Sequence, residues 1–320
     1  MFAAIVALLL PAPARAQNVT SWVASGGNNS NPCTRSQPCL TFETAIVKTN
    51  AGGQVSCIDA GEFGGGQLID IVRTITIDCE GVGGGMLGPA VNVPTIQIEA
   101  GPNDVVIIRG LFIGNIQNST AGIGFLSGGE LRVEKCIIYG FSDGSGIAFQ
   151  NGQSSPSPMV LMVSDTALVN NGIASSGAGI LVQPTMTNSI SKVVLDHVVA
   201  QGNFFGIKAD GTMTAGGVIN MTVRESVAAG NTSNGIVATG NSAGPAIIMK
   251  VDRSTSSHNA AGFGVIADGP KTTIRLNNST VSGNIKGIGA SNGGVLASYM
   301  NNDVDGNSTD GSPTTIIGFK

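Results

Sequence analysis

The sequence predicts an all-β chain that folds as a right-handed parallel β-helix (a solenoid) of about nine or ten coils. The first observation behind this prediction is a unit of roughly 25 residues that recurs from about residue 105 onward. The second is composition: 47 glycines, 42% hydrophobic, 11% charged and 4% aromatic residues suit many short strands joined by tight turns. A solenoid lengthens its core along one axis, so 320 residues fit one domain.

Each unit contains an apolar strand, a two-residue polar step, a second short strand and a loop that closes on Gly-Ile or Gly-Val. Two-residue hairpin signals do not recur between the strands, so antiparallel pairing is disfavoured. Parallel stacking of each strand on its counterpart in the next unit, ~4.8 Å away, fits the spacing. The closing pairs are Gly122-Ile123, Gly146-Ile147, Gly179-Ile180, Gly206-Ile207, Gly235-Ile236, Gly264-Val265 and Gly287-Ile288.

The N-terminal part divides into two segments ahead of the β-helix at 51–320. Residues 1–16 combine an apolar run with Ala14-Arg15-Ala16, which predicts a secretory signal peptide cut before Gln17. The run is too short to span a membrane, and no later segment is long and apolar enough. Residues 17–50 contain a Pro-rich Cys33/Cys39 loop, followed by Phe42, Ala45 and Ile46 at helical spacing, which predicts a short capping helix.

Five cysteines suit an exported protein. We predict a disulfide between Cys33 and Cys39, which flank a Pro-bearing loop. Cys57 and Cys79 end similar strand-like runs, so they are either bridged between neighbouring coils or packed as small core residues. Cys136 is predicted to be a buried thiol. Two histidines and this cysteine spacing do not suit zinc, and we expect neither a metal nor another cofactor.

Two periodic rows accompany the repeat. One consists of asparagines that could form a structural hydrogen-bonded ladder along the axis. The other consists of charges at the two-residue step; Asp196, Arg224 and Asp252 alternate in sign, as do Glu225 and Arg253 beside His197. We interpret this row as structural pairing, with His197 as a catalytic base the alternative. The asparagines are Asn115, Asn170, Asn203, Asn231, Asn259, Asn284 and Asn307.

The chain resembles the pectin lyase-like superfamily and, more narrowly, a group of secreted bacterial β-helix proteins whose roles are mostly unassigned. The resemblance rests on the repeat units and on residues 39–63, where a short helix and then the first strand resemble the start of the superfamily's solenoid. It implies the fold and not an activity. The Asp-Asp pair, the Gly-His-Gly and the Arg-x-Lys of polygalacturonase-like hydrolases are absent, and no carboxylate cluster matches the calcium site of pectate lyases.

Alternation along the strands after Gly-Ile still gives a candidate site on the outer face. Lys208 and Asp210 should stand on one face of a rung, with Asp268 two rungs away, or ~9–10 Å. One hypothesis makes Asp210 and Asp268 an acid/base pair with Lys208 as electrostatic partner; the other makes them solvated surface residues. The binding candidates on the same face are Gln150, Gln183 and Thr239.

Two functions remain. The first is a non-catalytic surface or matrix protein that presents a rigid face to a polysaccharide or partner; the second is a polysaccharide lyase or glycoside hydrolase acting on an extracellular polymer. The net charge of −4 argues against a nucleic-acid partner. An acidic tail, Asp303 to Asp310, resembles a calcium loop only superficially. The short C-terminal end predicts either end-on homo-oligomers or a last strand folded over the core.

Overall fold

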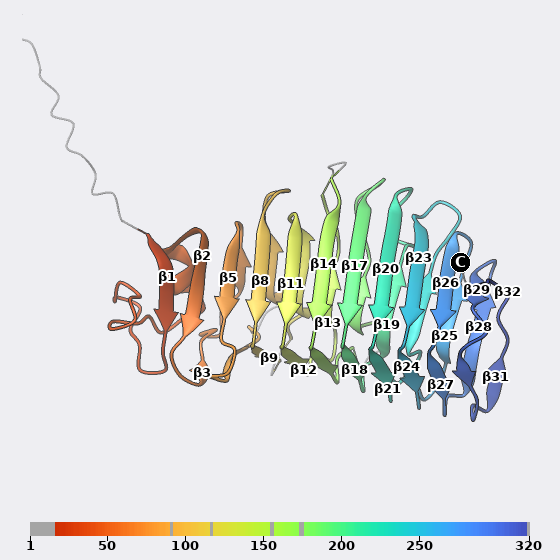
Figure 1. Cartoon of the computed structure of the whole chain (residues 1–320). Helices are drawn as coiled ribbons and strands as arrows, with labels where there is room; N and C mark the ends of the chain where they lie inside the picture. The colour runs from red at the N-terminus through yellow and green to blue at the C-terminus, as the bar shows by residue number, and fades with distance from the viewer. Residues whose placement is uncertain (1–16, 90–91, 116–117, 154–156, 173–175, 319–320) are drawn as a thin grey trace, which may run out of the picture.

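The computed structural model describes residues 17–89, 92–115, 118–153, 157–172 and 176–318; the predicted signal peptide at 1–16 lies outside them. These residues form an elongated right-handed parallel β-solenoid of about nine turns (Figure 1). Each turn contributes a strand to sheet 1, then sheet 2, then sheet 3, and every strand pairs in parallel with its counterpart in the next turn. The predicted right-handed parallel β-helix is therefore confirmed.

Sheet 1 has twelve strands within the described residues and runs the length of the solenoid. They are β1 (Asn18–Val23), β2 (Thr49–Cys57), β5 (Ile75–Asp78), β8 (Val105–Arg109), β11 (Glu130–Glu134), β14 (Met159–Ser164), β17 (Ile190–Asp196), β20 (Val218–Arg224), β23 (Ala246–Asp252), β26 (Thr272–Asn277), β29 (Val295–Ser298) and β32 (Thr315–Ile316).

Sheet 2 has ten short strands in the described part of the chain. They are β3 (Gly61–Glu62), β6 (Gly84–Leu87), β9 (Phe112–Gly114), β12 (Ile137–Tyr139), β15 (Ala167–Val169), β18 (Val199–Gln201), β21 (Val227–Ala229), β24 (Thr255–Ser257), β27 (Thr280–Ser282) and β30 (Asp303–Val304).

Sheet 3 also has ten strands among the described residues. They are β4 (Ile69–Ile71), β7 (Pro94–Glu99), β10 (Ala121–Ser127), β13 (Ser145–Phe149), β16 (Ala178–Val182), β19 (Phe205–Asp210), β22 (Ile236–Thr239), β25 (Phe263–Asp268), β28 (Lys286–Ser291) and β31 (Thr309–Gly311).

The core is built from single-file stacks of inward side chains. In sheet 3 the Ile or Val of each closing pair aligns with the next, as in Ile147, Ile180 and Ile207. All three side chains are fully buried. Parallel strands buried on one face at a fixed ~4.8 Å spacing place equivalent residues in contact, which gives one continuous apolar interior.

A two-residue corner joins sheet 1 to sheet 2 in the rungs from β8–β9 to β26–β27. Its first residue is left-handed, with positive φ at Lys135, Asp165, His197, Glu225 and Arg253. Its second residue points inward. The predicted polar step lies one residue earlier than this corner: its leading residue, such as Glu134 or Asp196, ends the sheet 1 strand, and its following residue, such as Lys135 or His197, is the first residue of the corner. Within these rungs the constant corner keeps the sheet 1 and sheet 2 strands in register.

The asparagine ladder exists, but two predicted members were wrong. Each ladder amide donates to the side-chain oxygen of the next, as Asn203 Nδ2 does to Asn231 Oδ1 at 3.2 Å. Asn115 and Asn170 occupy the position just before the ladder position in their rungs. Their backbone N–H groups bond to the next rung in the same way as that of Gly202, the residue before the ladder member Asn203. Asn170 takes the left-handed turn position, and Asn171 points inward in its place. The ladder is Asn171, Asn203, Asn231, Asn259, Asn284 and Asn307.

The N-terminal rungs are fastened by disulfides. Cys33 bonds to Cys39 as predicted, and Cys57 bonds to Cys79 between adjacent coils, which decides the alternative left open by sequence. Gly84 lies over the second bridge, where a Cβ would stand 2.7 Å from the sulfur of Cys57. Both bridges suit an oxidising compartment.

Two further features of the described residues were anticipated. Cys136 is buried, and burial raises the pKa of its thiol to about 12, so it remains protonated and unreactive. A six-residue helix, α1 (Phe42–Val47), follows the N-cap Thr41 and packs against β1, β2 and β4. Its predicted role as a cap stays a prediction. No helix in the described segments is long and apolar enough to cross a membrane.

Candidate functional site

A groove of about 430 Å³ lies on the outer face of sheet 3. Its floor is one file of outward residues on five consecutive strands, β7 to β19. They are aligned by strand register, so the file spans ~19 Å along the solenoid. The second and third residues, Gly124 and Ala148, are the smallest, which leaves the face hollow there. The file is Gln97, Gly124, Ala148, Leu181 and Lys208.

A second file of outward positions runs beside the first. Leu126, Gln150 and Gln183 line the groove, so two of the three predicted binding residues lie in it together with Lys208. The register continues through Asp210, Thr239 and Asp268, which are not among the residues that line the groove. Thr239 thus stands between the two predicted carboxylates and apart from the glutamines.

Lys208 closes the groove at its C-terminal end. Its ammonium lies 2.8 Å from an Asp210 carboxylate oxygen and 4.7 Å from the centre of the Phe205 ring. Asp210 is only 5% exposed, so it is not the solvated residue that the surface interpretation requires. Burial alone would raise the pKa of Asp210, but hydrogen bonds from Lys208 and Thr212 outweigh it and hold that pKa below its usual value.

The proposed acid/base pair of Asp210 and Asp268 gains little support from this geometry. The carboxylate of Asp268 accepts hydrogen bonds from Ser291 at 2.5 Å and Asn292 at 2.8 Å, on the side away from Asp210. A general acid needs a raised pKa, whereas that of Asp210 is lowered. The catalytic role of the pair stays a prediction.

Beyond Lys208 the same outer face is filled. Val237 and Ile266 continue the file in register, yet they are 3% and 7% exposed. An outward position on this face is therefore not always exposed. The Phe263 ring crowds this part of the face, since it lies 2.5 Å from where a Gly289 Cβ would be. Bulky residues here end the groove.

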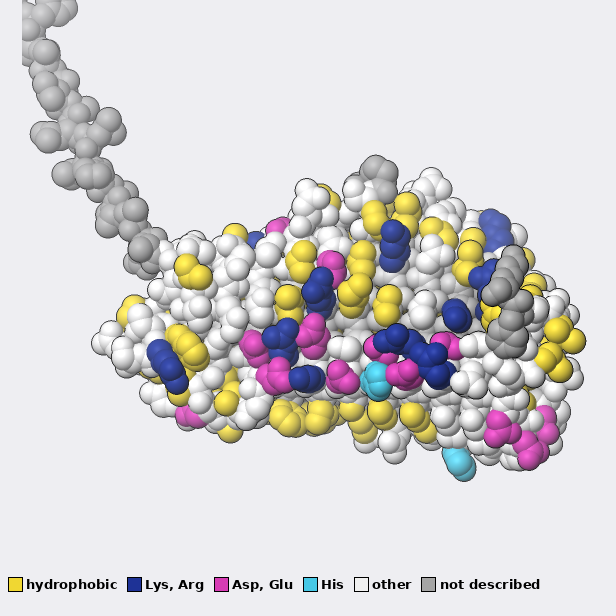
Figure 2. Space-filling view, viewed as in Figure 1, with side chains coloured by type: hydrophobic (Ala, Val, Ile, Leu, Met, Phe, Trp, Pro, Cys, Tyr) yellow, Lys and Arg dark blue, Asp and Glu magenta, His cyan; other side chains and the backbone are white. Residues whose placement is uncertain are grey.

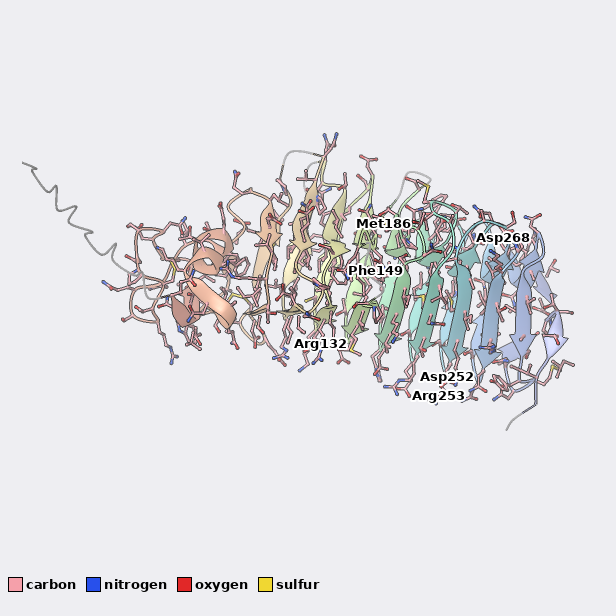
Figure 3. The ribbon with its side chains drawn as sticks, turned by 90° about the horizontal axis from the view of Figure 1, so that it is seen from above. Arg132, Phe149, Met186, Asp252, Arg253 and Asp268 are labelled. Carbon is pink, nitrogen blue, oxygen red and sulfur yellow. A yellow bond between two sulfur atoms is a disulfide. The ribbon has the colours of Figure 1, made fainter. Side chains whose placement is uncertain are left out.

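A band of alternating charges follows the corner between sheets 1 and 2 (Figure 2). Arg109 pairs with Glu134 at 2.8 Å and with Asp78 at 3.3 Å, one rung to either side. Farther along, Arg224 pairs with Asp196 at 2.5 Å. Figure 3 places Asp268, on sheet 3, on the opposite side of the solenoid from Asp252 and Arg253 in this band. The band is separate from the groove, and its predicted structural pairing is seen directly.

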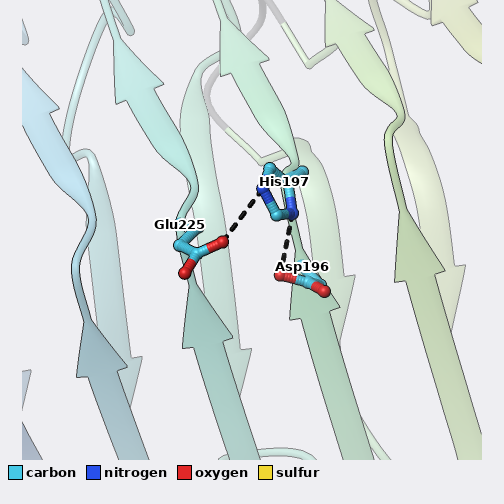
Figure 4. Close-up of side chains that lie close together, drawn as sticks. All are labelled: Asp196, His197 and Glu225. Atoms are coloured by element: carbon cyan, nitrogen blue, oxygen red, sulfur yellow. Dashed lines mark ion pairs between the residues drawn. The ribbon is translucent and has the colours of Figure 1, made fainter.

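His197 belongs to this band. Its Nδ1 lies 3.0 Å from Asp196 and its Nε2 lies 2.9 Å from Glu225 (Figure 4). Within the described residues these three form the one group of metal-ligating side chains close enough to share an ion. Arg224 and Arg253 already contact the two carboxylates, however, so these negative charges are compensated by guanidinium groups of the chain itself. The arrangement therefore serves charge pairing better than metal binding.

Sequence reasoning missed several polar groups of the groove, among them Gln97 and Asp143. Gln97 occupies the first position of the floor file, and Asp143 lies on its wall. The signal that could have found Gln97 was the run of small outward residues, Gly124 and Ala148, one and two rungs after it. Asp143 lies in a loop, so strand alternation did not reach it.

Comparison with known proteins fixes the fold. No family model matches the chain, and no curated protein does either. The solved structure of pectate lyase Pel9A superposes with a TM-score of 0.54 at 14% identity, covering 90% of this chain and 79% of that one. The chain has the pectin lyase-like β-helix fold. At this identity the likeness concerns architecture alone.

Two other solved structures match more loosely. A rhamnogalacturonan lyase has a TM-score of 0.46 at 12% identity, over 92% of this chain and 88% of that one. A GH136 lacto-N-biosidase from Eubacterium ramulus has a TM-score of 0.47 at 13% identity, over 94% of this chain and 67% of the other.

Proposed function

We propose that the chain is a carbohydrate-active protein that binds an extracellular polysaccharide in the sheet 3 groove. The observation that carries the proposal is the file of aligned outward residues from Gln97 to Lys208, with Gln150 and Gln183 beside it. Amide groups both donate to and accept from sugar hydroxyls. A straight file across five rungs suits an extended polymer, and the fold shared with a pectate lyase supports the same class of ligand.

Lys208 should determine which polysaccharides the groove prefers. It is the one Lys or Arg among the described residues that line the groove, and its ion pair with Asp210 fixes its position. A fixed ammonium at one end can bind the carboxylate of a uronic acid. The amides in the middle suit uncharged hydroxyls. We therefore expect a polysaccharide with few acidic residues and not a dense polyuronate.

A catalytic version, a polysaccharide lyase or glycoside hydrolase, would use the same groove. Asp143 is the one carboxylate of the described residues that lines it, and it lies on the same surface as Lys208. A carboxylate and an ammonium facing one bound chain are groups that can move a proton and stabilise charge. This pair replaces Asp210 and Asp268 as the first place to look for turnover.

The test is a panel of neutral and acidic polysaccharides incubated with the mature protein, with binding measured by calorimetry. New reducing ends and absorbance from unsaturated uronates report turnover. Lys208→Ala and Gln183→Ala should each weaken binding about 10-fold, whereas Lys192→Ala, an exposed lysine on sheet 1, should not. Turnover by the unaltered protein that is lost in Asp143→Asn would show that the protein is an enzyme and that Asp143 takes part in the reaction. Equal binding by Lys208→Ala, Gln183→Ala and the unaltered protein would overturn the proposal.

A further inference from the structure

A second recess lies on the outer face of sheet 2, over β3, β6, β9 and β12. It encloses about 360 Å³. This face adjoins the charge band, and Figure 2 shows hydrophobic side chains gathered in a row below that band. The recess is lined by three glycines and by a carboxylate and two aromatic rings that face solvent. These residues are Gly61, Gly83, Gly85, Glu62, Phe112 and Tyr139.

The recess exists because outward positions on neighbouring rungs lack side chains. Gly85 aligns with Phe112 and has no room for a Cβ, which would stand 2.6 Å from the Phe112 carbonyl oxygen. Gly114 aligns with Tyr139, and a Cβ there would lie 2.6 Å from the phenol ring. The Tyr139 ring therefore lies over Gly114 and leans toward the recess. A larger residue at either glycine would displace an aromatic wall.

The carboxylate on the opposite wall is held rigidly. Glu62 Oε1 accepts hydrogen bonds from the N–H groups of Gly64 at 2.9 Å and Leu87 at 3.2 Å, and Oε2 accepts one from Gly65 at 3.2 Å. Three backbone donors fix the orientation of the group, while each carboxylate oxygen keeps further acceptor capacity. A fixed acceptor binds a ligand without losing side-chain entropy.

The aromatic rings face solvent instead of the core. Phe112 is 44% exposed and Tyr139 is 40% exposed. Within the described residues neither ring stacks on another aromatic side chain. Two exposed rings beside a fixed carboxylate combine an apolar platform with a hydroxyl acceptor, and this combination matches the two faces of a sugar, one of C–H groups and one of hydroxyls.

We infer that this recess binds an uncharged sugar residue of a glycan, stacked on Phe112 and Tyr139 with its hydroxyls donating to Glu62. The carboxylate repels uronic acids, so the site selects neutral sugars. It lies on a different sheet from the groove, and the inference does not depend on the proposed function. Where both sites bind one polymer, the recess adds a second point of attachment and raises the overall affinity.

The experiment titrates cellohexaose, xylohexaose and hexagalacturonate into the mature protein, with nuclear magnetic resonance as the readout. We expect saturable binding of at least one neutral hexamer, with perturbed Phe112 and Tyr139 ring signals. Tyr139→Ala and Phe112→Ala should each weaken it about 10-fold. Val199→Ala, an exposed apolar residue on the same outer face, is the matched control and should leave it unchanged. Circular dichroism confirms that each variant is folded.

Charge selectivity separates the recess from the groove. Glu62→Gln should weaken the neutral hexamer and reduce the discrimination against hexagalacturonate. Binding that survives Tyr139→Ala but is lost in Gln183→Ala would place the ligand in the groove and overturn this inference while leaving the proposed function intact. The absence of saturable binding by both neutral hexamers would also overturn it. So would self-association abolished by Tyr139→Ala, because the recess would then hold a second copy of the chain.

Discussion

The rungs before Asn171 and those from Asn171 onward are held together by different contacts. The earlier rungs rely on the Cys57–Cys79 bridge and on the stacked rings of Phe125 and Phe149, 5.2 Å apart. The later rungs rely on the asparagine ladder. Outside, the sheet 3 groove crosses this division, because it runs from Gln97 to Lys208, and the same face is filled only from Val237 onward. The difference teaches that binding surface and internal fastening are separate properties of a rung.

The largest expected effect is on the ladder of the later rungs. Asn231 is fully buried; it accepts from the Asn203 N–H and side-chain amide and donates to Ala200 and Asn259. Asn231→Ala should lower the free energy of unfolding by about 4 kcal/mol, because it leaves several buried polar groups unpaired. Denaturant titration measures the loss. Hydrogen exchange should localise it to the rungs around β21 rather than to those around β5.

The matched control for this variant is Asn220→Ala, which removes an exposed, outward amide from the adjacent strand β20. It should change the free energy of unfolding by less than about 0.5 kcal/mol. Equal losses from Asn220 and Asn231 would mean that the ladder does not fasten the later rungs. The contrast between the two regions would then have no energetic basis.

The next effect concerns the hollow of the earlier rungs. Ala148→Leu adds three carbons to the floor of the groove at one of its two smallest residues. Polysaccharide binding should therefore weaken about 100-fold with the fold intact. Calorimetric titration gives the affinity. Ala167→Leu makes the same change on the outer face of sheet 2 and should leave binding unaltered. Should Ala148→Leu bind as tightly as the unaltered protein, the hollow is not the binding surface.

The smallest effect is expected in the later rungs, at the end of the groove, where Lys208 pairs with Asp210. Because the pKa of Asp210 is lowered by folding, its contribution is fully present above about pH 4 and is lost as pH falls through its folded value. Asp210→Asn should cost about 1–2 kcal/mol between pH 5 and 8. The difference from the unaltered protein should vanish in strong acid. Denaturation at several pH values tests this, and a difference that grows on acidification would contradict it.

Much of the fold could be predicted because it depends on local spacing. The Gly-Ile pairs recur with the period of one coil, and the two-residue step places its charges on one corner. The prediction named Asn170 in place of Asn171 as a ladder member, because the two asparagines are adjacent and spacing alone does not say which one points inward. The sequence could not decide whether Cys57 and Cys79 are bonded for a related reason, since the bond depends on how two coils superpose.

The candidate site was predicted less well than the fold. Alternation correctly set Lys208 outward together with Gln150 and Gln183. It could not show that Val237 and Ile266, also outward, are buried, because that depends on how bulky side chains pack on the outer face. It also treated Asp210 as either catalytic or solvated, whereas its neighbours Lys208 and Thr212 enclose it.

The alternating charges at the corner restrict which coils can lie next to one another. Removal of the single coil that carries Arg224 would bring Asp196 beside Asp252, two carboxylates one rung apart, whereas removal of that coil and the next would bring Asp196 beside Asn277. Like charges at that distance repel. Over this stretch, the repeat therefore tolerates the loss of paired coils better than the loss of one, which favours growth or shortening of the solenoid by twos.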